Sequence, residues 1–166
     1  VLSLGVGFKK VIAMDEDTFR SDEVIADHKE RLAHVDNDGV TFKSHLDGSM
    51  HRFTPEISMQ VQHKIGADII FAFDECTTLM NSKEYQKIAL DRTLAWAHRC
   101  IAEHRKLTQE REGKPYQALF GVIRGAQYED LRKEAARTIA QLDFDGFGIG
   151  GAIDKSALTE IVSWVT

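Results

Sequence analysis

Three short apolar runs, each followed by a segment with helical periodicity, form the clearest pattern in the chain. They cover residues 67–73, 118–123 and 146–150. The first run starts after Gly66 and ends in polar residues, which is typical of a strand buried on both faces in a parallel sheet. The repeat therefore predicts three successive strand–helix units, with a parallel sheet and helices outside it.

Two helices have clear start signals. The first begins after Thr54, a favourable N-cap, with Pro55 in the first helical position, and it ends at Gly66. Its predicted buried stripe consists of Ile57, Val61 and Ile65. The second helix begins near Ser82, and its apolar period is carried by Tyr85, Ile88, Ala89, Trp96, Cys100 and Ile101.

Two further helices follow the second and third apolar runs. One presents an apolar face made of Tyr128, Leu131, Ala135, Ile139 and Leu142. The last is capped by Asp154 or Ser156, and its inward positions are Leu158, Ile161, Val162 and Val165. Each predicted strand is thus followed by a helix that can cover the sheet.

The residues before the first apolar run have a different pattern. Residues 40–46 alternate between polar and apolar, Asp47-Gly48 is a strong hairpin turn signal, and residues 50–53 form the returning segment. We therefore expect an N-terminal β-hairpin outside the main sheet. Leu2, Leu4, Val6 and Phe8 also alternate with small residues, which favours either a strand or an ordered loop.

The fold class that fits this order of elements is α/β, as a partial (β/α)8 TIM-type barrel of about three units. No glycine-rich phosphate fingerprint follows any strand, so a doubly wound sheet is the alternative rather than the first choice. The chain starts at Val1 instead of methionine, and its last helical segment carries no stop signal. We expect residues 1–166 to be one domain, a fragment of a larger barrel.

Composition narrows the class of protein. The chain is 43% hydrophobic and 28% charged, which is ordinary for a globular protein, and no apolar run approaches the roughly 20 residues of a membrane span. We therefore expect a cytoplasmic protein with no membrane partner. The net charge of −5 argues against a general nucleic-acid-binding surface but leaves room for a local basic patch. Cys76 and Cys100 form no C-x-x-C pair.

Several motifs, taken in order, resemble the tRNA-guanine transglycosylase (queuine tRNA-ribosyltransferase) family. They are Ser44–Ser49, Thr54–Glu56, Phe71–Cys76, Leu119–Val122, Tyr128–Arg132 and Gly146–Gly151. The resemblance implies a (β/α)8 barrel enzyme, a pentosyltransferase that exchanges guanine at the tRNA wobble position for a 7-deazaguanine of the preQ1 or queuine type. Its expected partners are the tRNA anticodon loop, the base and a second copy of the full-length chain.

The resemblance also assigns residues to the base pocket. Guanine presents its N1–H and 2-amino donors beside the O6 acceptor, and Asp74 corresponds to the carboxylate that accepts both donors. Gly151 corresponds to the residue whose backbone N–H binds O6, and Gly150 beside it allows the backbone to approach a flat ligand. A plain strand-to-loop turn is the simpler interpretation of the glycine pair. Cys76 matches a pocket position, although a small space-filling residue explains it equally well.

Arg124 departs from the family pattern, which commonly has glutamine at this position. An arginine can only donate hydrogen bonds, and it places a permanent charge close to Asp74. It can turn into the pocket and pair with Asp74, or point outward to a tRNA phosphate. Because neighbouring strand ends lie within reach of an arginine side chain, we expect the pair with Asp74 in the free protein, opening when the base binds.

The resemblance places the family's two catalytic aspartates and its zinc ligands outside these residues, so we expect the 166-residue piece alone to be inactive in base exchange. Two other functions remain open. One is a non-catalytic base- or tRNA-binding subunit, or a truncated product, of the same family. The other is an unrelated barrel enzyme that acts on a small metabolite. The two tryptophans are interpreted as packing residues on helices. Four histidines, His51, His63, His98 and His104, are interpreted as surface or helix-face residues.

Overall fold

The computed structural model describes residues 33–151 and 153–166, so the alternation predicted for residues 2–8 lies outside the described part. These residues form a mixed α/β structure with two three-stranded sheets. The first sheet contains β1 (Ala33–Val35), β2 (Val40–Lys43) and β3 (Met50–Phe53); the second contains β4 (Ile69–Phe71), β5 (Ala118–Ile123) and β6 (Gly146–Ile149). The helices are α2 (Pro55–Ile65), α3 (Lys83–Glu110), α4 (Glu129–Ile139), the 3-10 helix η3 (Lys155–Ala157) and α5 (Leu158–Val165).

The second sheet is parallel and has the order β4-β5-β6. Helix α3 connects β4 to β5, and α4 connects β5 to β6, so the predicted succession of strands and helices is confirmed. Phe71 lies opposite Phe120, and Phe120 lies opposite Gly146, which fixes the register across all three strands. The carboxyl ends of the strands therefore share one edge of the sheet.

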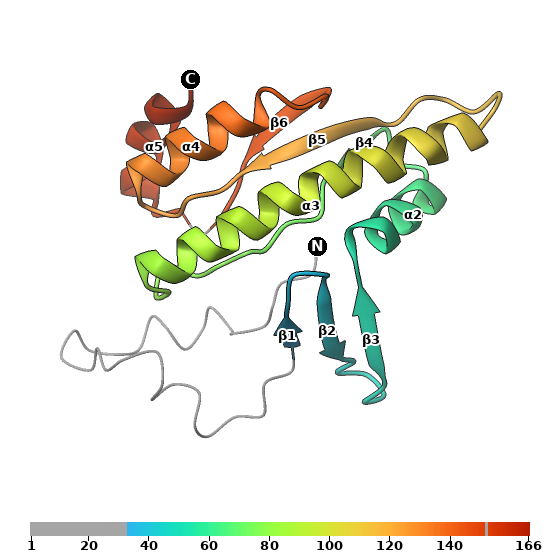
Figure 1. Ribbon diagram of the computed structural model, residues 1–166, viewed down its shortest axis with the longest axis horizontal. Helices are drawn as coiled ribbons and strands as arrows, with labels where there is room; N and C mark the ends of the chain where they lie inside the picture. The colour runs from blue at the N-terminus through green and yellow to red at the C-terminus, as the bar shows by residue number, and fades with distance from the viewer. Residues whose placement is uncertain (1–32, 152) are drawn as a thin grey trace.

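The first sheet is antiparallel and lies on the other side of α3 from the parallel sheet (Figure 1). Its β2 and β3 strands are joined by a turn in which Asp47 Oδ1 accepts a hydrogen bond from the backbone N–H of Ser49 at 3.1 Å. The loop between β1 and β2 contacts α3, because the indole Nε1–H of Trp96 donates to the Asn37 carbonyl at 2.7 Å. This contact ties the small sheet to the long helix.

Helix α2 starts and ends where the sequence predicts, but it buries a different face. Thr54 Oγ1 accepts from the backbone N–H of Ile57 at 3.3 Å, and Gly66 closes the helix in the left-handed conformation with φ 78°. The predicted stripe is wrong, since Ile65 is 73% exposed and Val61 is 38% exposed. Met59 and His63 are buried instead, because this side of α2 packs against α3 and β4.

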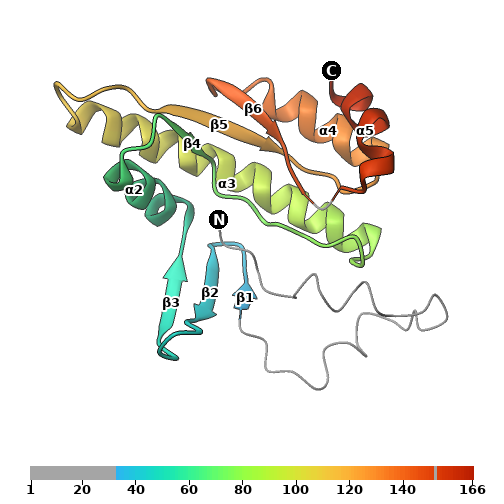
Figure 2. The ribbon, with the colours of Figure 1, turned by 180° about the vertical axis from the view of Figure 1, so that it is seen from behind.

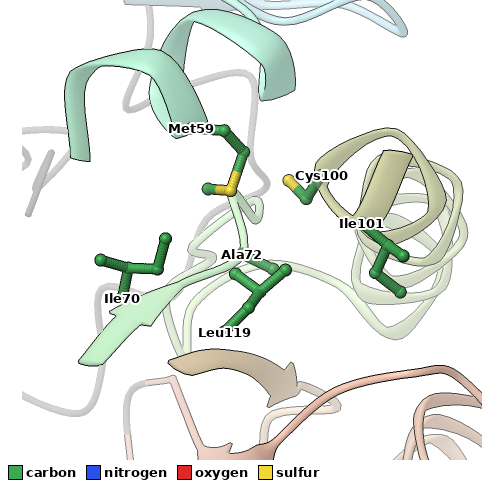
Figure 3. Packing of buried hydrophobic residues seen from close by; sticks show 6 residues of the cluster. All are labelled: Met59, Ile70, Ala72, Cys100, Ile101 and Leu119. Atoms are coloured by element: carbon green, nitrogen blue, oxygen red, sulfur yellow. The ribbon is translucent and has the colours of Figure 1, made fainter. Parts of the chain in front are cut away.

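The core under the parallel sheet joins α2, β4, β5 and α3. Its buried members are Met59, Ile70, Ala72, Cys100, Ile101 and Leu119, which point toward one another from these elements (Figure 3). A second cluster connects α3 to α4 through Leu90, Ala97, Ile123, Leu131, Ala135 and Ile139. Ile88, predicted to be buried, is 51% exposed; it lies about 100° around α3 from the buried Ala89.

Helices cover only one face of the parallel sheet among the described residues. Ile70 and Leu119 pack against α3, whereas Ile69 is 52% and Phe71 is 45% exposed, as the alternation along a strand requires. The prediction that the first run is buried on both faces is therefore wrong for the described chain. Seen from behind, α3 runs alongside β5 (Figure 2), and α4 also packs against β5. None of the described helices is long and apolar enough to cross a membrane.

Candidate functional site at the strand ends

Polar groups collect where the three parallel strands end. Asp74 follows β4, Arg124 comes directly after β5, and Gly150 comes directly after β6. The segment in front of Asp74 is anchored on α3, since the ring of Phe73 stacks on Trp96 at a centroid distance of 5.0 Å and the backbone N–H of Phe73 donates to Cys100 Sγ at 3.2 Å. Asp74, Arg124 and Gly150 are thus held at one edge of the sheet, although Arg124 and Gly150 follow Asp74 by 50 and 76 positions in the sequence.

Arg124 forms an ion pair with Asp74. Both Nε and Nη2 of the guanidinium contact Asp74 Oδ2, and the side chains are only 13% and 18% exposed. Burial raises the pKa of the Asp74 carboxyl, and the charge and hydrogen bond of Arg124 oppose this effect. The predicted pairing is confirmed, so in the described state a guanidinium occupies an oxygen of the carboxylate assigned to the base.

Cys76 and the glycine pair surround this ion pair. Arg124 Nη1 donates to the exposed Cys76 Sγ at 3.6 Å. A Cβ atom built on Gly150 would lie 2.6 Å from Val122 Cγ1 and 3.2 Å from the Arg124 guanidinium carbon, so a larger residue there requires one of these side chains to move. Gly151 has φ +109°, a conformation that favours glycine. The five residues predicted from the sequence are therefore together, although their role in binding a base stays a prediction.

Glu75 belongs to a second, adjacent network that the sequence does not reveal. Its side chain is 2% exposed, its Oε1 accepts from the Tyr85 hydroxyl at 2.6 Å, and Arg92 Nη1 contacts its Oε2. The backbone N–H of Glu75 also donates to Thr93 Oγ1 at 3.1 Å. Arg92 reaches further, to Asn37 Oδ1 at 3.3 Å. Glu75 thereby fixes the backbone next to Asp74 to α3.

Arg132, on α4, is the second residue that sequence reasoning missed. It is fully buried, and it donates to three backbone carbonyls: Nε to Ala126 at 2.9 Å, and Nη1 to Ile123 and Gly150 at 2.8 Å each. Its Nη2 has no hydrogen-bond partner among the described residues. Burial and the neighbouring Arg124 lower the pKa of Arg132 to about 10. The hydrophobic periodicity does not indicate this buried position, because an arginine next to Leu131 is normally interpreted as a surface residue.

A cavity of about 240 Å³ lies beside these strand ends. The loops after β4, β5 and β6 each contribute to its wall, which is formed by Leu79, Gln127, Ile153, Asp154, Ala157 and Ile161. None of the ion-pair residues lines it. The sequence did not single out this cavity, because its wall is made of loop and helix residues with no motif of their own.

His63 and His104 lie on α2 and α3, but the surface alternative is wrong for both, since their side chains are buried. Their rings share a hydrogen bond of 2.8 Å between His63 Nε2 and His104 Nδ1. Burial, together with the nearby His104 and Arg111, lowers the pKa of His63 to about 4. Across residues 33–151 and 153–166, no three His, Cys, Asp or Glu side chains come together as a metal site.

The fold and the site together define a class of protein: a mixed α/β protein whose acid, guanidinium and glycine groups gather at the carboxyl ends of parallel strands. A family model, "Queuine tRNA-ribosyltransferase", matches residues 3–166. The chain belongs to this family.

Curated relatives carry the same name. The queuine tRNA-ribosyltransferase of Herpetosiphon aurantiacus is 51% identical over 117 residues, which cover 70% of this chain and 28% of the relative. The enzyme of that name from Roseiflexus sp. is 44% identical over 138 residues, covering 79% and 34%. That from Acetivibrio thermocellus is 45% identical over 120 residues, covering 72% and 30%. The chain thus spans about a third of the length of the relatives it matches.

Proposed function

We propose that the full-length protein is a tRNA-guanine transglycosylase and that this chain supplies its base pocket. The reaction exchanges guanine at the wobble position of tRNA for a 7-deazaguanine. The observation that carries the proposal is the gathering of Asp74, Arg124, Cys76, Gly150 and Gly151 at one edge of the parallel sheet, in a chain of this family.

The chemistry of guanine fits this set of groups. A carboxylate at position 74 can accept from N1–H and from the 2-amino group, which are adjacent donors on the same edge of the base. The backbone at Gly151 offers an N–H donor to O6, and the absence of a Cβ lets a flat ring approach. The buried position of Asp74 strengthens such hydrogen bonds, because little water competes for the carboxylate.

The pocket has to open before a base binds. Arg124 occupies Asp74 Oδ2 in the described state, so the guanidinium must leave that oxygen when N1–H and the 2-amino group arrive. A guanidinium and the donor edge of guanine are similar in this respect, since both present parallel N–H groups to a carboxylate. Arg124 therefore acts as an internal competitor for the base.

We propose that the parallel sheet is part of a (β/α)8 barrel with its site at the carboxyl ends of the strands. The exposed apolar side chains on the face away from α3, Ile69 and Phe71, are then covered by the other strands of the barrel. The catalytic aspartates and the zinc ligands belong to other segments of the full-length protein. A homodimer and a cytoplasmic location complete the proposal.

The test measures incorporation of labelled guanine into tRNA by the full-length protein, with a no-protein control. Incorporation that requires Asp74, and that is unchanged in the control variant Asp68→Ala at the opposite end of β4, is the expected result. Binding of guanine or tRNA without exchange would replace the proposal with the alternative, a non-catalytic binding subunit of the family. Binding of neither would remove both.

A further inference from the structure

Arg132 holds the peptide bond that joins Gly150 to Gly151. Its Nη1 donates to the Gly150 carbonyl oxygen at 2.8 Å and, with the same nitrogen, to the Ile123 carbonyl at 2.8 Å. The Gly150 backbone N–H in turn donates to Ile123 at 3.0 Å. The ends of β5 and β6 are thus clamped together by one buried guanidinium.

The position of this clamp matters because a trans peptide has its carbonyl and its N–H on opposite sides. The N–H in the same peptide unit as the Gly150 carbonyl belongs to Gly151. A hydrogen bond from a charged donor to the carbonyl fixes the plane of the peptide and polarises it, which makes the N–H a stronger donor. Arg132 therefore orients and polarises the backbone N–H of Gly151 through the carbonyl on the opposite side of the same peptide.

The surroundings of Arg132 favour an electronegative atom over Gly151. A Cβ atom built on Gly151 would lie 3.3 Å from Arg124 Nη1 and 3.5 Å from Arg132 Nη2. Arg132 has no carboxylate partner among the residues that the structure describes, and its Nη2 is buried without an acceptor. The space left by the missing side chain is therefore bordered by two cationic nitrogens.

We propose that Arg132 is the positioning residue that makes the site select a 6-oxo purine, by orienting and polarising the Gly150–Gly151 peptide toward O6. This inference rests on the proposed function. It adds a residue that does not touch the base, and it predicts a specific dependence on the atom at position 6.

The test compares guanine with 6-thioguanine as probes of the full-length protein. The thio analogue keeps N1–H and the 2-amino group for Asp74, but its sulfur is a weaker acceptor than oxygen. Arg132→Met is expected to weaken guanine binding about tenfold and 6-thioguanine binding by less than about threefold. The matched control is Arg137→Met, which changes an exposed arginine on the same helix and should affect neither base.

The outcomes separate the inference from the function on which it rests. Equal losses for both bases in Arg132→Met overturn the inference, whereas a wild-type protein that binds no guanine overturns the proposed function. If Arg132→Met does not fold, Arg132→Lys keeps the charge but cannot reach all three carbonyls, and a loss confined to guanine is again expected. Wild-type protein that binds both bases equally well overturns the inference whatever the variants do.

Discussion

Asp74 and Glu75 are neighbours in the sequence, and each is paired with an arginine, yet they are held in different ways. Glu75 is bound through both oxygens, by Tyr85 and Arg92, and through its backbone N–H. Asp74 is contacted by Arg124 through one oxygen, and burial raises its pKa. The difference indicates that Glu75 is committed to the fold, while Asp74 keeps a single exchangeable partner.

The largest effect is expected from Glu75→Ala, because it leaves the guanidinium of Arg92, only 11% exposed, without its carboxylate partner. Breaking a buried pair in this way costs about 3–5 kcal/mol of unfolding free energy. Denaturant unfolding of the full-length protein measures it. The control is Glu129→Ala, which breaks an exposed pair with Lys133 worth about 0–1 kcal/mol. If the two variants lose the same unfolding free energy, Glu75 contributes no more to stability than an exposed ion-pair residue does.

Asp74→Ala is expected to lower guanine exchange at least about a hundredfold in the full-length protein, since a desolvated hydrogen-bonded charge is worth about 2–5 kcal/mol in binding. Asp74→Asn should lose less, because its amide still offers one acceptor oxygen. Exchange of labelled guanine is measured together with the free energy of unfolding, so that a loss of activity is distinguished from a loss of stability. If Asp74→Ala exchanges guanine as wild type does, Asp74 has no part in the site.

Arg124→Gln is expected to tighten guanine binding about tenfold, because it removes the competitor for Asp74 and restores a group that both donates and accepts. Affinity for tRNA should not change. Both affinities are measured at two salt concentrations, since a lost phosphate contact would weaken tRNA binding and make its salt dependence shallower. That second result would assign Arg124 to the tRNA backbone instead.

A smaller effect is expected from pH. In the proposed base pocket, guanine binding needs the ionised carboxylate of Asp74, whose pKa lies above its ordinary value of 3.8. Affinity is therefore expected to be complete above the raised pKa and to fall as the pH drops through it. The fall is no steeper than about tenfold per pH unit for one proton. Because Arg124 lowers this pKa, Arg124→Gln should move the fall to higher pH. If guanine affinity falls at the same pH in the wild type and in Arg124→Gln, Arg124 does not influence the pKa of Asp74.

The sequence predicted the strands, the helix starts and the ion pair, because these depend on local signals and on spacing. Thr54, Ser82 and Gly66 carry their capping chemistry in the residue itself. Arg124 can reach Asp74 because they follow adjacent parallel strands, β5 and β4, and this does not depend on how the helices pack.

Burial was harder to predict where two surfaces compete for the same helix. Helix α2 carries an apolar stripe, but Met59 and His63 face α3 instead, and a pattern of apolar residues does not say which neighbour a helix will meet. The buried roles of Arg132 and Glu75 have no sequence signal for a similar reason. Charged residues read as solvated until the fold supplies carbonyls or a partner for them.

The glycines of β6 link sequence variation on three strands. A Cβ atom at Gly146 would lie 2.5 Å from Phe120 Cζ, and one at Gly148 would lie 2.8 Å from Phe71 Cε1. A residue larger than glycine at position 146 or 148 therefore requires the aromatic ring that reaches it, Phe120 on the adjacent strand or Phe71 on β4, to move or to become smaller. Among homologues, positions 146 and 120, and positions 148 and 71, are expected to change in pairs, so that each glycine of β6 is inherited together with the ring that lies against it.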